Sequence, residues 1–395
     1  MKTEQLSATA TPTVRLPIIP RIFYFAWYTT LGVYFPFITL YYRESGLSLT
    51  QIGYLLALPG VAQIIAGPLW GLLADSLRIH RILLPIAIIG TVIPTTLIGR
   101  FQDVTPILFL AAAAAIFSIP IAPLADTASL ALLGERHAQY GSLRVWGAVG
   151  WGISTVAAGV VVERMGLSII FWLYPLFGLL TLLTALVLPK VALNPTNTLS
   201  AARKLLRDPR WVRYMLCVLL IGCSSALMHG FLSIYLAELG AGRDKIGLAY
   251  MIASLSEMPV MLLATLVLRR GGAKPLRVCA GLAYSLRLTI FALFPDPTIV
   301  LAAQLLHGFC FGTLWIAGVH EAQRLAPAGL AATAQSLLGT ATFGIAVVLA
   351  NLVGGMIYQS TGSATLFGTA AFLALLGGLG FLIPVGRDET AQNSA

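Results

Sequence analysis

Residues 106–131 read PILFLAAAAAIFSIPIAPLADTASLA, a run in which Asp126 is the only charged residue. As a helix, such a run is long enough to cross a hydrocarbon core of about 30 Å. A carboxylate at that depth costs roughly 2.5–3.5 kcal/mol on insertion scales, and acids inside membrane spans are therefore rare and usually functional. The stretch predicts a membrane-spanning helix that carries a functional acid.

The rest of the chain has the same character. It is 58% hydrophobic and 10% charged, with a mean hydropathy of +0.87, whereas soluble domains carry about 25% charged residues. The apolar runs are continuous, which favours helices over the alternating strands of a membrane β-barrel. We predict an all-α integral membrane protein with 12 transmembrane helices, at residues 19–42, 51–74, 82–99, 106–131, 143–163, 167–188, 212–237, 246–268, 276–294, 298–322, 331–357 and 364–384.

The distribution of basic residues predicts the topology. Eighteen of the 25 Lys and Arg residues fall in the two terminal segments and every second loop, and five fall in the other loops. The positive-inside rule then places both termini in the cytoplasm of a multi-pass protein of the plasma or inner membrane. The net charge of +10 is explained by this topology and indicates no nucleic-acid partner. The N-terminal tail lacks the features of a signal peptide.

The spans divide into two sets around a polar, basic segment. We predict a disordered cytoplasmic tail at 1–18, an N-terminal six-helix bundle at 19–189, a cytoplasmic linker with a short amphipathic helix at 190–210, a C-terminal six-helix bundle at 211–385 and a cytoplasmic tail at 386–395. The two bundles echo each other. Gln51-Ile52-Gly53 opens the second span as Lys245-Ile246-Gly247 opens the eighth, and Gly166 follows the fifth as Gly362 follows the eleventh. We therefore expect pseudo-symmetric halves.

The fifth span joins a cation to an aromatic ring. Arg144 and Trp151 are seven residues apart, so they share a helix face and lie about 10 Å apart along its axis. Gly147 and Gly150 between them leave room for a ligand or for a close helix. A guanidinium fork and an indole suit a solute with a ring and with hydroxyl or carboxylate groups. The alternative is that Trp151 only packs and Arg144 only neutralises an acid.

Three further ionisable residues lie within the C-terminal spans. Glu257, Arg287 and His307 fall in the eighth, ninth and tenth spans, where they can form one cluster. An Arg neighbour favours the charged carboxylate and burial favours the neutral acid, so relative motion of the two would load and release a proton. His307 is expected to donate to the solute or to relay protons, with satisfied packing as the alternative.

Asp75 ends the second span beside Arg78. An acid at the negative end of a helix dipole needs a cationic partner, so the two are expected to form a latch that breaks as the halves move. The alternative is a solvated loop acid. The four cysteines all lie in apolar spans, where we expect small core residues and neither a disulfide nor a metal site.

Several motifs together resemble the major facilitator superfamily, in its lactose permease-like and 3-phenylpropionate permease-like branch with nucleoside–proton symporter relatives. They are Gly32-Val33-Tyr34-Phe35-Pro36-Phe37, Gly71 to Asp75, Arg144 to Trp151, Ser285-Leu286-Arg287 and Leu306-His307. The resemblance covers essentially all twelve spans and implies the major facilitator fold. Ser76 and Cys310 depart from it, because the family has a basic residue and, in lactose permease, a proton-carrying Glu at these places.

The resemblance also implies roles. In the family, an acid of helix four and an Arg of helix five bind substrate, and a Trp of helix five stacks on the sugar; these map onto Asp126, Arg144 and Trp151. The helix-ten His maps onto His307, which is implied in substrate binding and proton coupling. The helix-eight acid and helix-nine Arg map onto Glu257 and Arg287, implied in proton coupling.

We therefore expect a secondary active transporter that imports a small polar ring-containing solute with protons, with a sugar or glycoside as the leading substrate. Nucleosides or aromatic acids are the next alternative, followed by drug–proton antiport and by a non-transporting sensor. No nucleophile–base set or metal-ligand cluster points to an enzyme. The expected partners are the solute, protons and the lipid bilayer, with the proton gradient as energy source, no cofactor and a monomeric state.

Overall fold

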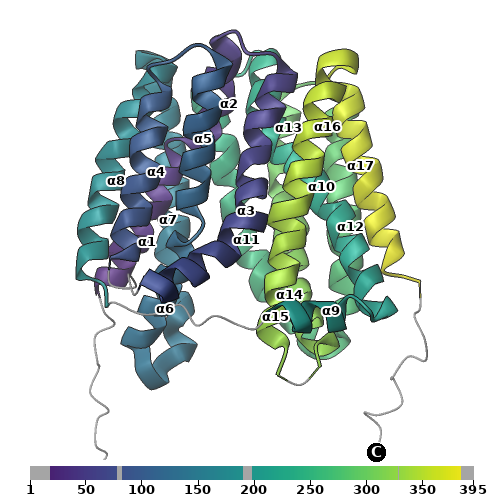
Figure 1. Cartoon of the computed structure of the whole chain (residues 1–395). Coiled ribbons are helices and arrows are strands. Elements are labelled where there is room, and N and C mark those ends of the chain that lie inside the picture. Colours follow the sequence, from purple (N-terminus) through teal and green to yellow (C-terminus); the bar gives the residue numbers. More distant parts are fainter. Residues whose placement is uncertain (1–17, 78–81, 190–197, 328, 384–395) are drawn as a thin grey trace, which may run out of the picture.

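The computed structural model describes residues 18–77, 82–189, 198–327 and 329–383, and these ranges are helical without any β-strand (Figure 1). The all-α prediction is confirmed. Within them, ten helical segments are long and apolar enough to cross a membrane. The predicted spans at 19–42 and 82–99 fall outside that set of ten: the first is broken into two helices, and the second is a helix of 16 residues. The chain is thus a multi-pass membrane protein, and the count of twelve spans is not shown.

The helices fall into two sets in chain order. The N-terminal helices are α1 Ile18–Gly32, α2 Phe35–Glu44, α3 Leu49–Leu77, α4 Leu83–Ile98, α5 Val104–Ser118, α6 Ile121–Leu133, η1 Gly134–Gln139, α7 Tyr140–Met165, η2 Leu167–Ile169 and α8 Ile170–Val187. A short helix, α9 Thr198–Leu205, follows. The C-terminal helices are α10 Pro209–Glu238, α11 Arg243–Gly271, α12 Ala273–Leu293, α13 Pro297–Ala303, η3 Gln304–Leu306, η4 Gly308–Gly312, α14 Thr313–Leu325, α15 Ala331–Gly339, η5 Thr340–Ile345, α16 Ala346–Thr361 and α17 Ser363–Gly380.

Proline explains two of the breaks. Pro36 occupies the first turn of α2 and has no N–H to continue the hydrogen-bond ladder of α1. Pro120 likewise cannot donate to the carbonyl of Ile116 four residues earlier. That carbonyl instead accepts a bond of 2.8 Å from the indole Nε1 of Trp70 on α3. The freed backbone group is satisfied, as a membrane interior requires, and α6, which carries Asp126, begins after this break.

Figure 1 shows the N-terminal helices on one side of the molecule and the C-terminal helices on the other. We call the end that carries α9, α14 and α15 the basic end, because Arg203, Lys204, Lys274 and Arg324 lie there; the opposite end, with Glu44 and Arg243, is the far end. The helix predicted within the linker is present as α9. Its Leu205 is buried in the protein core and the helix contacts α15, so this part of the linker packs on protein.

Two glycine crossings hold the sets together, α3 against α16 and α7 against α11. A Cβ on Gly53 would lie 2.4 Å from the carbonyl oxygen of Asn351, and one on Gly247 would lie 2.1 Å from that of Thr155. Only glycine allows backbones this close. These two glycines are the residues whose motifs echo each other in sequence, and each belongs to a contact between the two sets.

The second echo also has a structural basis. Gly166 ends α7 with φ +84°, and Gly362 ends α16 with φ +86°, a left-handed backbone that favours glycine. At the far end, the Arg243 guanidinium lies 2.7 Å from Glu44, and its backbone N–H donates to Glu163 at 2.6 Å. The Arg243 and Glu44 side chains are 35% and 49% exposed, so the ion pair contributes at most about 1 kcal/mol. The ion pair is therefore a minor part of the contact between the two helix sets, and the packing of the helices is the larger part.

Candidate functional site

The first polar cluster, which we call the N-terminal cluster, consists of Tyr24, Tyr28, Asp126 and Arg144. Arg144 Nη1 donates to Asp126 Oδ1 at 2.9 Å, and Arg144 Nη2 donates to the Tyr28 hydroxyl at 2.7 Å. The Tyr24 hydroxyl donates to the same Asp126 oxygen at 2.7 Å. The guanidinium also lies over both phenol rings, 5.5 Å from the centroid of Tyr24 and 5.4 Å from that of Tyr28. The Asp126–Arg144 pair suggested by the sequence is present, and two tyrosines that the sequence did not indicate complete it.

The glycines of the fifth span explain this geometry. A Cβ on Gly147 would lie 2.7 Å from the Tyr28 ring, and one on Gly150 would lie 2.4 Å from the Phe25 carbonyl oxygen. Of the two uses predicted for these glycines, the structure shows the close helix. α1 lies against α7, and this contact puts Tyr28 on Arg144.

Trp151 lies about two turns after Arg144 on α7 and contacts both helix sets. Its ring centroid is 6.0 Å from that of Phe35 on α2 and 6.4 Å from that of Tyr250 on α11. The Tyr250 hydroxyl shares a hydrogen bond of 3.1 Å with Ser233. The indole is half-buried, so it combines packing contacts with an accessible face.

The second cluster, which we call the C-terminal cluster, consists of Glu257, Arg287, Gln304 and His307. His307 Nε2 lies 3.0 Å from Glu257 Oε1, and His307 Nδ1 lies 2.8 Å from Arg287 Nη1. Arg287 is fully buried and its Nη2 donates to Gln304 Oε1. Because a guanidinium has no acceptor, Nδ1 of His307 must accept, and the ring proton resides on Nε2 and donates to Glu257. His307 is therefore neutral in this arrangement and links a cation to an acid.

Backbone contacts set the register of the C-terminal cluster. A Cβ on Gly308 would lie 2.1 Å from the carbonyl oxygen of Ser256, and the Gly308 N–H donates to the Ser256 hydroxyl at 2.9 Å. These contacts fix the neighbouring residues, Glu257 and His307, opposite each other. The π-helical turn η4 follows His307 directly, and such turns are frequent at functional sites.

His229 extends the C-terminal cluster onto α10. Its ring centroid is 5.4 Å from that of His307, and its Nδ1 lies 2.9 Å from the Ser225 carbonyl oxygen, so Nδ1 carries the proton. The Ser225 hydroxyl accepts from Tyr284 at 2.9 Å. The sequence shows a histidine in an apolar span and does not predict this contact, because the contact depends on how α10 packs against the helix of His307.

The two clusters lie on helices that pack against each other. Arg144 is on α7 and Glu257 on α11, and these two helices are in contact, with the ring of Trp151 on α7 beside that of Tyr250 on α11. The side chains of Arg144, Asp126 and Glu257 are 38%, 32% and 24% exposed although they lie within helices predicted to span the membrane. Charged groups of both helix sets thus keep accessible surface within these helices.

The remaining predicted residues are those of the latch and the cysteines. The Asp75 side chain and all of Arg78 lie outside the described residues, so the latch remains a prediction. Cys310 is fully buried beside Arg287, and the four cysteines are free.

Near the basic end, the buried Glu321 lies 2.7 Å from Arg277 and 2.8 Å from Arg324. Sequence reasoning counted these arginines only as topology signals.

Comparison with known proteins identifies the family. The model of the MFS_1 like family matches residues 18–369. The chain belongs to this family. It is similar to the maltose permease of Geobacillus stearothermophilus, with 26% identity covering 94% of this chain and 95% of the relative. It is also similar to the probable 3-phenylpropionic acid transporter of Escherichia coli K12, with 22% identity covering 89% and 93%.

Solved structures support the same fold. The nucleoside transporter NupG superimposes with a TM-score of 0.81 at 18% identity, covering 93% of this chain and 98% of that protein. The resemblance to major facilitator permeases read from the motifs is thereby confirmed. The protein is a major facilitator transporter that acts on small molecules, and it is not an enzyme.

Proposed function

We propose that this major facilitator protein is a proton-coupled symporter that takes up a small polar ring-containing solute, with a sugar or glycoside as the leading substrate. The observation that carries the proposal is a pair of ionisable clusters on helices of the two sets that pack against each other. Asp126 and Arg144 come from the N-terminal helices, Glu257 and His307 come from the C-terminal helices, and α7 contacts α11. Ionisable groups at membrane depth are costly, so their placement on facing helices favours carriage of a polar solute.

The N-terminal cluster supplies the chemistry for solute binding. In this role, Arg144 offers guanidinium N–H groups and Asp126 a carboxylate, a combination that hydrogen-bonds hydroxyl groups from both sides. Trp151, with its half-buried indole, stacks on the ring of the solute. His307 contributes from the opposite helix set. The identity of the maltose permease relative supports a sugar, and the 3-phenylpropionic acid relative supports an aromatic acid as the second candidate, with Arg144 as its carboxylate partner.

The C-terminal cluster supplies the chemistry for proton coupling. Glu257 accepts from His307 Nε2–H as a carboxylate. When a proton from the aqueous phase binds Glu257, this acceptor becomes a hydroxyl donor, and the bond to His307 is weakened. Arg287 cannot carry the proton because a guanidinium stays charged; its role is to hold His307 in the Nε2–H form. Release of the proton to the other side restores the carboxylate.

We further propose the arrangement of the two bundles, 19–189 and 211–385, that this cycle needs. They rock about the shared site, and the described structure is the state closed at the far end by the two glycine crossings. The basic end is cytoplasmic under the positive-inside rule. The chain works as a monomer in the plasma or inner membrane, with the proton gradient as energy source and no cofactor.

The test is uptake into proteoliposomes that hold the purified full chain. Labelled maltose, 3-phenylpropionate and xanthosine are offered with and without an imposed inward pH gradient. The proposal expects gradient-driven accumulation of at least one of them. Equilibration without accumulation would contradict proton coupling, and binding without entry would favour a sensor. Arg144→Gln is the matched control, because it removes the proposed solute contact and leaves the lipid-facing surface unchanged.

A further inference from the structure

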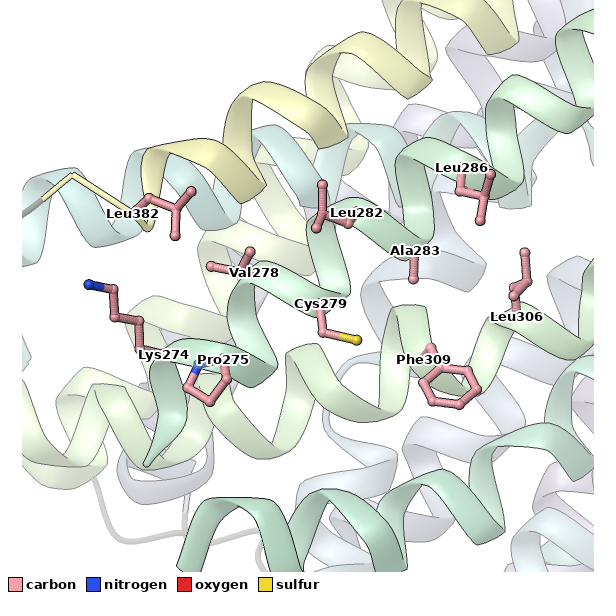
Figure 2. A pocket seen from close by; sticks show the side chains of 10 residues that line it. All are labelled: Lys274, Pro275, Val278, Cys279, Leu282, Ala283, Leu286, Leu306, Phe309 and Leu382. Atoms are coloured by element: carbon pink, nitrogen blue, oxygen red, sulfur yellow. The ribbon is translucent and has the colours of Figure 1, made fainter. Parts of the chain in front are cut away.

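The outer face of α12 carries a groove that is separate from the candidate site. It has a volume of about 640 Å³ and lies between α12, the helix with Leu306 and Phe309, and Leu382 after α17. Figure 2 shows Lys274 at one end, Cys279 near the middle and Leu286 at the other end of the row along α12. Leu282, Leu286 and Phe309 are 44%, 55% and 41% exposed, so this apolar surface is open to the bilayer.

The groove has the length of one leaflet. Lys274 and Leu286 are twelve residues apart on α12, which corresponds to about 18 Å along a helix. Half of a hydrocarbon core of about 30 Å is about 15 Å. A lipid whose acyl chain ends beside Leu286 would therefore have its headgroup at the level of Lys274.

The charge of the groove lies at the end where a headgroup would lie. Lys274 is the only charged residue among those that line it. Lys274 is exposed, and so are Arg269 and Arg270 in the last turn of α11 just before it. Within the described part of the chain, no acid pairs with Lys274. A basic group at the mouth of an apolar groove between membrane helices matches the phosphate of an anionic lipid.

A second groove has an apolar lining but lacks a basic residue at its end. Between α3 and α5, a space of about 200 Å³ is lined by apolar residues, among them Leu58, Trp70 and Ile116, and by no charged one. Both grooves expose apolar surface, so both suit acyl chains of any lipid. Only the groove on α12 adds a cation at headgroup depth.

We propose that the α12 groove is a binding site for one anionic phospholipid of the leaflet at the basic end. Its acyl chain lies along Cys279 and Leu286, and Lys274 pairs with its phosphate. The site shares a wall with the C-terminal cluster, because Leu286 precedes Arg287 and Phe309 follows His307 by two residues. The lipid thus supports the outer side of the helices whose inner side carries Arg287 and His307. The proposal does not depend on which solute is carried or on proton coupling.

The test is native mass spectrometry of the purified full chain titrated with phosphatidylglycerol or with phosphatidylcholine of the same acyl chains. A lysine near a headgroup contributes about 1 kcal/mol, which corresponds to about a fivefold preference for the anionic lipid. Lys274→Gln should remove that preference. Lys245→Gln, at the far end, should leave it unchanged. Equal binding of the two lipids by the unmodified chain, or a preference that survives Lys274→Gln, would overturn the proposal.

Cys279 supplies a local readout, because it lines the groove and the other three cysteines are buried. Phosphatidylglycerol should slow maleimide labelling of Cys279 in the unmodified chain more than phosphatidylcholine does, and Lys274→Gln should abolish that difference. An unchanged labelling rate would place the lipid elsewhere and refute the site. Protection by oleate equal to that by phosphatidylglycerol at the same concentration would refute the assignment to a phospholipid.

Discussion

Gly247→Ala should open the far end of the protein. A Cβ at this position would lie 2.1 Å from the Thr155 carbonyl oxygen, whereas ordinary contacts begin at 3.4 Å. The backbones of α7 and α11 must therefore separate by about 1.3 Å at the crossing. Overpacking of this kind costs roughly 1–3 kcal/mol. Because the cost applies only to the closed state, the open state should gain about 5- to 150-fold in relative population.

The assay is a distance measurement between spin labels at Arg164 and Lys245, which are exposed on α7 and α11. Gly247→Ala should add a population with a longer distance. Gly368→Ala is the control, because no atom lies within 4 Å of its added Cβ. A distance distribution unchanged by Gly247→Ala, or changed equally by both substitutions, would refute the idea that this crossing holds the far end closed.

The remaining predictions concern the clusters. Asp126→Asn should destabilise the protein in thermal unfolding by roughly 1–3 kcal/mol, between the limits for exposed and buried pairs, and adding Arg144→Gln should recover part of the loss; additive losses would contradict the pairing. Trp151→Ala should weaken solute binding about tenfold and Trp151→Phe less than threefold, since ring pairs contribute about 0.5–1.5 kcal/mol; equal losses would indicate packing alone. Glu321→Gln should cost about 3–5 kcal/mol of unfolding free energy because it leaves the buried Arg277 without a carboxylate, and a loss below about 1 kcal/mol would show that the pair is not structural.

Much of the fold was readable from composition and spacing. Continuous apolar runs predicted helices, and the echo of Gly53 in Gly247 marked the two places where backbones cross. The first span was predicted as unbroken, although Pro36 interrupts it, because an apolar run alone does not show where its hydrogen-bond ladder stops. Family and fold followed from the motifs, and the comparisons support both.

The polar clusters were readable only in part. Asp126 and Arg144 stood out because charges are rare in apolar spans, whereas Tyr24 looked like any aromatic residue in a membrane helix. Its contact with Asp126 depends on how deeply α1 packs against its neighbours. Glu321 lies near a helix end, where a charge is normally solvated, and the sequence predicts no partner for it. The structure buries it against Arg277, a contact between helices that linear spacing does not encode.

The most direct test of proton coupling is solute accumulation by Glu257→Gln in proteoliposomes. One pH unit corresponds to 1.36 kcal/mol, so a carrier with one proton per solute should concentrate its solute about tenfold. Gln keeps an acceptor for His307 Nε2–H and cannot bind the proton. The account predicts that accumulation falls to about onefold while exchange of labelled for unlabelled solute continues. Tenfold accumulation by Glu257→Gln would contradict it.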